Sequence, residues 1–382
     1  MDPFATVEPR YGRESLADVL PSALSVLGVP GEPDPLGLRA QLDGVRRIAV
    51  VLLDGLGWHQ LPPAAADAPT LTDIAEGRLG TARPITSGFP STTPVSLVTL
   101  GTGAAPGRHG IVGFNLNRPG TDQIVNHLRW TDEPDPRTWQ PLPTAFTRAH
   151  EAGLSPTVVT DPKFRGSGLS VSAFRGARLG PGVEADAVAE GMLAALRESR
   201  LVYGYLPDVD RAGHDFGLGT PQWHAAASEA DRLVTRLLDG LPPDSALIVV
   251  ADHGQLDVPA DRRLDLDRDP RLTAGVAVVA GEARVRYLHT IPGARGDVLA
   301  AWRAVLGDGA WVTTREEAVA AGWFGPVPES HLQRIGDVVV VCRDRWVVLA
   351  SAHEPPRLGT MVAFHGSSTA AEMEIPLLIV RR

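Results

Sequence analysis

Arg46-Arg-Ile-Ala-Val-Val-Leu-Leu-Asp-Gly55 is the segment that indicates the fold class of this chain most clearly. Its apolar run, 48–53, suits a strand that is buried on both faces, as the strands of a parallel sheet are. Asp54 and Gly55 follow the strand, and a glycine lets the backbone turn sharply there. Ligands of open parallel sheets bind beyond the carboxyl ends of the strands, so Asp54 is placed to reach a metal ion. Taken alone, such an aspartate is more often a turn residue that ends a strand.

Further apolar runs have the same character and alternate with segments of helical periodicity. Alternation of strands and helices on this scale indicates βαβ units. We therefore predict a three-layer α/β/α sandwich with a mostly parallel central sheet. The predicted core strands are 46–53, 156–160, 201–206, 246–251 and 374–380, and the predicted helices are 14–27, 184–199 and 221–240.

The segment 256–350 differs from this pattern and is predicted to be a smaller α+β insertion, a cap region within one catalytic domain of residues 1–382. Its strand-like pieces lie close together, with an amphipathic helix between them. The predicted strands are 275–280, 284–289, 337–342 and 346–349, and the predicted helix is 296–306.

Composition limits the function classes. With 43% hydrophobic and 21% charged residues, the chain resembles soluble globular proteins. Its net charge of −9 argues against a general nucleic-acid-binding surface, which needs a basic footprint. The first residues show no secretory pattern and no run is long enough for a membrane span, so we expect no membrane association and a cytoplasmic location. Cys342 is the only cysteine, which excludes an internal disulfide and a thiolate-rich zinc site.

A hydroxyl-rich turn, Ser91-Thr92-Thr93-Pro94, precedes a predicted helix. Proline suits the first helical position, which would make Thr93 the residue that caps the helix. A hydroxyl at this place lies beside free backbone N–H groups and the positive end of the helix, which favour a phosphoryl oxyanion. An isolated Thr-Pro is more commonly a plain helix cap, so the functional interpretation depends on the other motifs.

Three further motifs supply carboxylates and imidazoles. Asp210 and His214 are four residues apart after the predicted strand 201–206, where we expect a loop pair that can chelate one metal ion. Asp208 and Asp215 are competitors for the carboxylate role. Asp252-His253 follows a strand, where two polar groups need partners. His365-Gly366 completes the set, and this histidine is significant only as part of it.

The order of these motifs resembles the alkaline phosphatase superfamily, and within it the type I phosphodiesterase/nucleotide pyrophosphatase family, which is related to phosphonoacetate hydrolases. That family has a nucleophilic Thr, a short helix, Thr-Gly, then Pro-x-x-His-Gly-Ile and a nearby Asn. Matching residues here are Thr93, Thr102-Gly103, Pro106-Gly-Arg-His-Gly-Ile111 and Asn115. The resemblance spans about 46–255 and 360–380, and the insertion shows no family motif.

The resemblance implies two divalent metal ions, with zinc the expected identity because nitrogen and oxygen ligands of this kind suit it. Thr93 would lie between the ions and also contact metal, and it would form a phospho-threonine intermediate. Two metal ions can stabilise the attacking and leaving oxygens of an in-line displacement. Asn115 would donate a hydrogen bond to a non-bridging phosphoryl oxygen. The implied ligands are Asp210, His214 and His365 for one ion, and Asp54, Asp252 and His253 for the other.

Several assignments stay open at this level. Ser91 and Thr92 compete with Thr93 for the nucleophile, and Pro94 removes one possible backbone donor to the oxyanion. Asn117 is the rival of Asn115. We expect His109 to be a structural loop histidine that supports the site.

The leading function is hydrolysis of a phosphodiester or pyrophosphate bond in a small-molecule phosphate ester or nucleotide. The alternatives are phosphonate or phosphomonoester hydrolysis, for which Lys163 and Arg165 are candidate cations, and a metal-binding homologue without turnover. A sulfatase is not expected, because no Cys/Ser-x-Pro-x-Arg pattern includes Ser91. The sequence sets neither the leaving group nor the oligomeric state.

Overall fold

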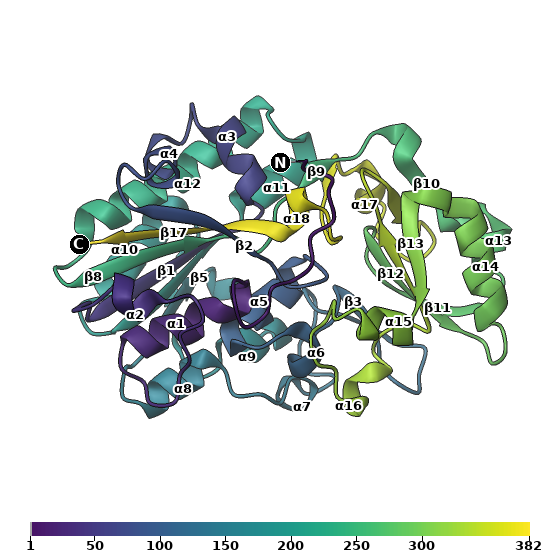
Figure 1. The fold of residues 1–382 in the computed structure, drawn as a ribbon, viewed down its shortest axis with the longest axis horizontal. Helices are drawn as coiled ribbons and strands as arrows, with labels where there is room; N and C mark the ends of the chain where they lie inside the picture. The colour runs from purple at the N-terminus through teal and green to yellow at the C-terminus, as the bar shows by residue number, and fades with distance from the viewer. Residues whose placement is uncertain (1) are drawn as a thin grey trace.

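The structure, a computed structural model, describes residues 2–382 and contains a central seven-stranded sheet (Figure 1). Five neighbouring strands are parallel, and the C-terminal strand β17 runs antiparallel to both of its neighbours. The strand order is β2 (Thr81–Thr86), β17 (Glu374–Arg381), β8 (Ser245–Val250), β1 (Arg47–Leu53), β7 (Leu201–Leu206), β5 (Thr157–Thr160) and β6 (Arg178–Pro181).

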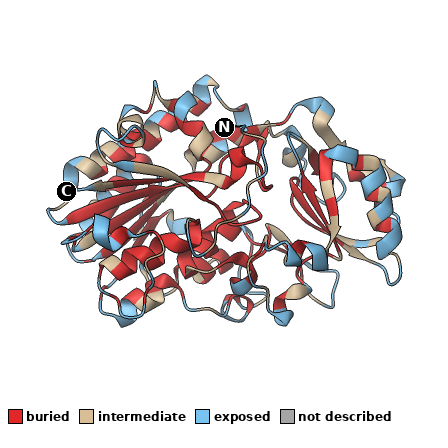
Figure 2. Ribbon diagram, in the orientation of Figure 1, coloured by how far each residue is buried: buried red, intermediate tan, exposed pale blue. Residues whose placement is uncertain are grey.

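Helices cover both faces of this sheet, which confirms the predicted α/β/α sandwich (Figure 1). Alternate residues of β1 enter two different cores: Ile48, Val50 and Leu52 pack on one side, and Ala49, Val51 and Leu53 on the other. Figure 2 shows the central strands buried. The first side packs against α1 (Val19–Val26), α5 (Thr93–Thr102), α8 (Ala145–Glu151) and α9 (Gly168–Phe174), and the second against α4 (Pro69–Ala75), α10 (Ala185–Ala195), α11 (Asp208–Phe216) and α12 (Pro221–Gly240).

A four-stranded antiparallel sheet lies within the segment predicted as an insertion. One of its faces joins the large core through Val285 and Tyr287, whereas Leu288 faces a separate core with α14 (Arg295–Leu306). The strand order is β11 (Val276–Gly281), β12 (Val285–Thr290), β14 (Val338–Cys342) and β13 (Ala310–Thr314).

Short strand pairs and helices complete the connections. A hairpin of β3 (Asn115–Asn117) and β4 (Ile124–Asn126) contacts β11. The remaining strand pairs are β9 (Leu256–Asp257) with β16 (Ala363–Phe364) and β10 (Arg263–Asp265) with β15 (Val347–Leu349). Two short helices are α6 (Pro106–His109) and α18 (Ala370–Met373). Between residues 2 and 382, none of the helices combines the length and the apolar character needed to cross a membrane.

A fully buried ion pair connects the four-stranded sheet, here called the second sheet, to the core of the sandwich. Arg284 contacts both carboxylate oxygens of Glu372, at 2.9 and 2.6 Å, and neither side chain is exposed. Glu372 also accepts hydrogen bonds from the Ser367 N–H and the Thr369 hydroxyl, and its carbonyl oxygen accepts the Gly254 N–H. The Glu372 carboxylate therefore joins the second sheet to the segment around residue 367, and the Glu372 backbone binds the segment around residue 254.

Replacing Glu372 by alanine is expected to lower the free energy of unfolding by about 3–5 kcal/mol, because Arg284 would remain buried without a counter-charge. Urea denaturation measures this loss. Glu316→Ala is the matched control, since its ion pair with Arg295 is exposed and contributes little. Equal effects of the two substitutions would contradict the structural role of the buried pair.

Candidate active site

Three acidic residues meet at one edge of the central sheet because β8, β1 and β7 are adjacent and parallel. Asp54 directly follows β1, Asp252 comes just after β8, and Asp210 lies in the first turn of α11, which begins just after β7. The carboxyl ends of parallel strands are where such sheets bind ligands. The topology therefore brings together carboxylates that are far apart in the sequence.

Gly55 allows the closest of these approaches. Its φ is +75°, and a Cβ atom there would lie 2.8 Å from the Cα atom of Asp210. The Asp210 N–H donates to the Asp54 carbonyl oxygen at 3.0 Å. A larger residue at position 55 would therefore push α11 away from the end of β1.

The structure corrects one prediction at this edge: Asp210 and His214 lie in the helix α11 and are not a loop pair. Their spacing places both on one helix face, and Asp210 Oδ1 is 3.2 Å from His214 Nε2. The competing carboxylates pair elsewhere, Asp208 with Arg211 at 3.3 Å and Asp215 with Arg357 at 2.7 Å.

Two sets of side chains offer atoms close enough to hold a metal ion. Within each set, the possible ligand atoms lie within 4.8 Å of one another. The first set is Asp210, His214 and His365, as the family resemblance implies; the second is Asp54, Asp210 and His253. Asp210 belongs to both sets. The family resemblance implies Asp252 as the third member of the second set, and Asp210 occupies that position in the structure.

Asp252 lies beside the second set without belonging to it. Its Oδ2 atom is 3.2 Å from His253 Nε2. Its Oδ1 atom accepts the N–H groups of Gly55, at 3.1 Å, and of His253, at 3.0 Å. Asp252 therefore orients the backbone of Gly55, which follows β1, and of His253, which follows β8. Its Oδ2 atom points toward the His253 ring.

Backbone carbonyls orient all three histidines. The Nδ1 atoms of His214, His365 and His253 lie 2.8, 2.9 and 3.2 Å from the carbonyl oxygens of Ala363, Ser91 and Gly254. When Nδ1–H donates to a carbonyl, Nε2 carries the lone pair that binds metals. The Nε2 atoms of His214 and His365 are 3.2 Å apart, and the rings of His253 and His365 stack at 3.6 Å.

The electrostatics of this cluster fit bound divalent cations. Burial, with Asp252 and Asp210 nearby, raises the pKa of Asp54 well above its ordinary value. Burial opposes ionisation of Asp210, but the surrounding histidines, His214 foremost, lower its pKa below the ordinary range. Within the described residues, Asp54 Oδ1 and Asp252 Oδ2 are buried without a hydrogen-bond partner. Buried oxygens of this kind need a compensating partner, and a divalent cation supplies one.

The candidate nucleophile lies beside the candidate metal ligands. Thr93 Oγ1 is 3.2 Å from His253 Nε2, and Thr93 is buried. The structure corrects the predicted cap by one position: Thr92 is the N-cap, and Thr93 is the first residue of α5. Pro94 then occupies the second helical position, so the helix end keeps the Thr93 and Val95 N–H groups.

The two rival hydroxyls are placed differently. Ser91 Oγ donates to the Ser367 carbonyl oxygen at 2.6 Å. Thr92 Oγ1 is buried and has no hydrogen-bond partner among residues 2–382. Thr93 is therefore the hydroxyl of this turn whose contact reaches a candidate metal ligand.

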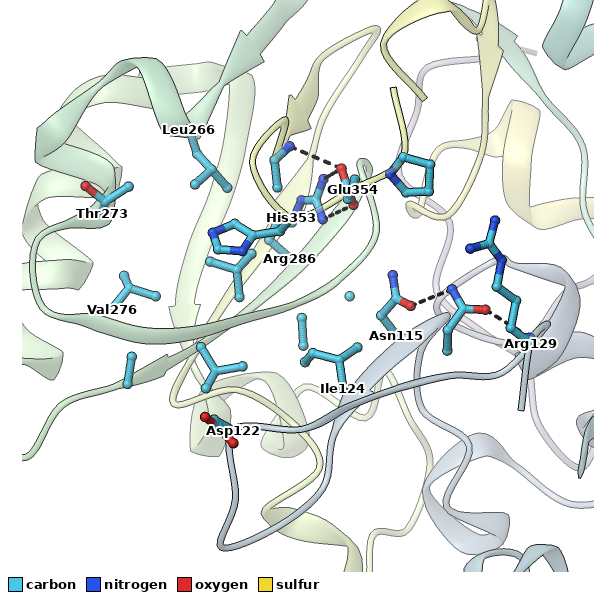
Figure 3. Close-up of a pocket in the computed structure, with 18 residues that line it drawn as sticks. Asn115, Asp122, Ile124, Arg129, Leu266, Thr273, Val276, Arg286, His353 and Glu354 are labelled. Atoms are coloured by element: carbon cyan, nitrogen blue, oxygen red, sulfur yellow. Dashed lines mark hydrogen bonds and ion pairs between the residues drawn. The ribbon is translucent and has the colours of Figure 1, made fainter. Parts of the chain in front are cut away.

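The β3–β4 hairpin carries both candidate asparagines. Asn115 Oδ1 accepts a hydrogen bond from Asn126 Nδ2 at 2.8 Å, and the Asn115 side chain lines a cleft (Figure 3). Asn117 is buried. His109, expected to be structural, has its Nε2 atom 3.0 Å from Thr99 Oγ1, and its Nδ1 accepts the Ile111 N–H.

Two residues that support the site were not identified from the sequence. The Tyr205 hydroxyl donates to Asp54 Oδ2, and Gln255 Nε2 donates to the Asp210 carbonyl oxygen at 3.1 Å. Both contacts hold a carboxylate residue in place. Tyr205 belongs to an apolar strand, where a tyrosine indicates only core packing, so the sequence carried no signal for it.

The candidate cations for a monoester lie on the loop after β5. Lys163 is exposed and pairs with Asp161 at 2.7 Å. Arg165 donates to the Leu179 carbonyl oxygen at 3.2 Å. Neither residue lines the cleft that contains Asn115.

Comparison with known proteins gives one family. The model of the type I phosphodiesterase/nucleotide pyrophosphatase family matches residues 48–368. An uncharacterized pyrophosphatase/phosphodiesterase of Schizosaccharomyces pombe is 27% identical over 238 residues, which are 59% of this chain and 48% of that protein. This chain therefore matches about half of the length of that curated relative.

Solved structures share the fold at low identity. Murine ectonucleotide pyrophosphatase/phosphodiesterase 5 has a TM-score of 0.71 at 22% identity, with 88% of each chain covered. An inactive variant of that murine protein has been solved in complex with AMP. Phosphonoacetate hydrolase from Sinorhizobium meliloti in complex with phosphonoacetate has a TM-score of 0.70 at 24% identity, with 88% of this chain and 90% of that chain covered.

Proposed function

This chain belongs to the type I phosphodiesterase/nucleotide pyrophosphatase family of the alkaline phosphatase superfamily, and from this premise we propose that it is a metal-dependent hydrolase of phosphodiester or pyrophosphate bonds. One observation carries the proposal. Thr93 Oγ1 lies 3.2 Å from His253 at the start of α5, beside two sets of metal-binding side chains that share Asp210. A nucleophile, ligands for two ions and a helix N-terminus thus meet at one place.

The proposed ligands are carboxylates and imidazoles from separate elements of the sandwich. Asp210, His214 and His365 would hold one ion, and Asp54, Asp252 and His253 would hold the other, with Asp210 close to both. Zinc is the proposed metal, because three or four nitrogen and oxygen ligands suit its coordination. When bound at these residues, two divalent ions would supply charge that lowers the pKa of the attacking hydroxyl and neutralises the leaving oxygen.

Thr93 acts as nucleophile in this proposal. Its Oγ1 forms a bond to phosphorus while the bond from phosphorus to the leaving oxygen breaks, and the hydroxyl proton passes to solvent. Water then attacks the phosphorus of the threonyl ester, the bond to Oγ1 breaks, and Oγ1 regains a proton. Asn115 donates to a non-bridging oxygen, and the N–H groups at the start of α5 face the same charge.

The proposed substrate is a small-molecule phosphate ester or nucleotide. Relatives of the same fold have been solved with AMP and with phosphonoacetate, which supports a ligand of this size. The exposed Lys163 is already paired with Asp161, which favours a diester over a phosphomonoester with its additional charge.

The matched substrates bis(4-nitrophenyl) phosphate and 4-nitrophenyl phosphate test this proposal. The zinc-loaded protein is expected to hydrolyse the diester with a kcat/KM at least about tenfold above that for the monoester, because differences in transition-state binding appear in this ratio. A preference for the monoester would favour the phosphomonoesterase alternative. Folded protein that binds zinc and hydrolyses neither substrate would be a non-catalytic homologue.

A further inference from the structure

A cleft of about 650 Å³ opens between the β3–β4 hairpin and β11, the edge strand of the second sheet (Figure 3). This volume lies in the range of small-molecule sites. Asn115 lines the cleft, and the whole of β11 forms the opposite wall. One side of the cleft therefore carries Asn115, the residue proposed to donate to the scissile phosphoryl group. The other side is a surface formed by the segment 256–350.

Two of the four formally charged Asp, Glu and Arg side chains that line this cleft neutralise each other. Arg286 contacts the two carboxylate oxygens of Glu354 at 2.5 and 2.7 Å, and it donates twice to the Val348 carbonyl oxygen. Figure 3 shows this pair on the side of the cleft formed by the second sheet. Because its donors and its charge are satisfied, Arg286 shapes the wall without attracting an anion.

Arg129 is different, because its guanidinium group has no ion pair in the part of the chain that the structure describes, residues 2–382. Asn126 Oδ1 accepts the backbone N–H of Arg129 at 3.1 Å, and Asn126 Nδ2 donates to Asn115. In Figure 3, Arg129 lies on the same side of the cleft as Asn115. Asp122, the anion of the hairpin, lies in the turn between β3 and β4, away from Asn115. The free cation is thus at the Asn115 end of the cleft.

We propose that Arg129 determines specificity by binding an anionic group that the substrate carries next to its scissile phosphoryl group. The proposal rests on the proposed function, which places the scissile group at Asn115. An arginine beside it favours a second phosphoryl group through a charge-assisted hydrogen bond. Ile124 and Val278 supply an apolar surface farther along the cleft for an organic group.

Two thymidine esters that share a scissile phosphorus separate the contribution of Arg129 from general activity. Attack on thymidine 5′-triphosphate at the α-phosphorus breaks its bond to the bridging oxygen and releases pyrophosphate. Attack on thymidine 5′-(4-nitrophenyl phosphate) releases 4-nitrophenolate, and water completes both reactions to give thymidine 5′-monophosphate. Arg129→Gln is expected to lower kcat/KM for the triphosphate by about 10- to 100-fold and to leave that for the nitrophenyl ester within about twofold.

Arg118→Gln is the matched control, because Arg118 belongs to the same hairpin, pairs with Glu133 at 3.5 Å and does not line the cleft. It is expected to leave both rates unchanged. Arg129→Lys, which keeps a positive charge, is expected to retain an intermediate rate on the triphosphate. Thermal unfolding of all three variants is expected to match the wild type, since the Arg129 guanidinium stabilises no neighbour by an ion pair.

The outcomes are distinguishable. An equal loss on both substrates, no loss on either, or a wild-type protein that cleaves only the nitrophenyl ester would overturn the role of Arg129 and leave the proposed function in place. A folded, metal-loaded wild type that cleaves neither ester would refute the proposed function itself.

Discussion

Thr93→Ala is expected to lower kcat for a phosphodiester by at least about three orders of magnitude, because it removes the atom that attacks phosphorus. The bound metal is expected to stay at the wild-type stoichiometry. The six proposed carboxylate and imidazole ligands remain in this variant, and the Thr93 hydroxyl is 3.2 Å from only one of them, His253. Steady-state kinetics and elemental analysis of the same purified sample measure both quantities.

Thr92→Ala is the neighbouring control. Its hydroxyl is buried, with no hydrogen-bond partner within residues 2–382, so the loss is expected to change kcat by less than about threefold. Thr93→Ser, which keeps a hydroxyl, is expected to retain measurable turnover. Full activity in Thr93→Ala together with inactivity in Thr92→Ala would assign the nucleophile to Thr92.

Removal of the metal ions is the second change with a very large expected effect. Dialysis against a chelator is expected to abolish diester hydrolysis, and zinc is expected to restore it. Without cations, burial raises the pKa of Asp54 and of Asp252, and the nearby Asp210 carboxylate adds to both shifts. Divalent cations would stabilise the ionised form of these carboxylates. Adding zinc at a hundredfold excess over Kd is therefore expected to raise the free energy of unfolding by about 2.7 kcal/mol, which increases the thermal unfolding temperature.

Single substitutions localise the metal effect. Asp252→Asn and His365→Ala are each expected to lower both metal occupancy and rate, since each removes a proposed ligand. Asp208→Asn is the control, because Asp208 pairs with Arg211 and is not one of the proposed ligands. Unchanged metal stoichiometry in the two ligand variants would refute the two-ion assignment.

The sandwich could be predicted because its central strands are buried on both faces. The run 48–53 is apolar throughout for that reason, and alternate residues of β1 do enter two cores. Two strands with weaker patterns, β2 (Thr81–Thr86) and β6 (Arg178–Pro181), were not predicted. Both contain proline and polar residues and lie at the edges of the sheet, where one side of the strand needs no hydrogen-bonded neighbouring strand.

Much of the candidate site was also predictable, because its ligands follow strand ends in a fixed order along the chain. The helical state of Asp210 and His214 was missed, since α11 is short and Gly213 lowers its helix propensity. Asp210 belongs to both candidate metal-binding sets because the turn at Gly55 lets α11 approach the end of β1 closely. The sequence does not show this approach, which depends on the folded backbone. Arg129 becomes a candidate only after the hairpin and β11, which are about 150 residues apart in the sequence, form opposite walls of one cleft.

The stereochemical course at phosphorus distinguishes a covalent threonine intermediate from direct attack by water. A phosphorothioate analogue of thymidine 5′-(4-nitrophenyl phosphate), of one configuration at phosphorus, is hydrolysed in ¹⁸O-labelled water, and the configuration of the product is determined. Attack by Thr93 followed by attack of water inverts phosphorus twice, so we predict overall retention. Overall inversion would show direct attack by water and would contradict a covalent threonine intermediate.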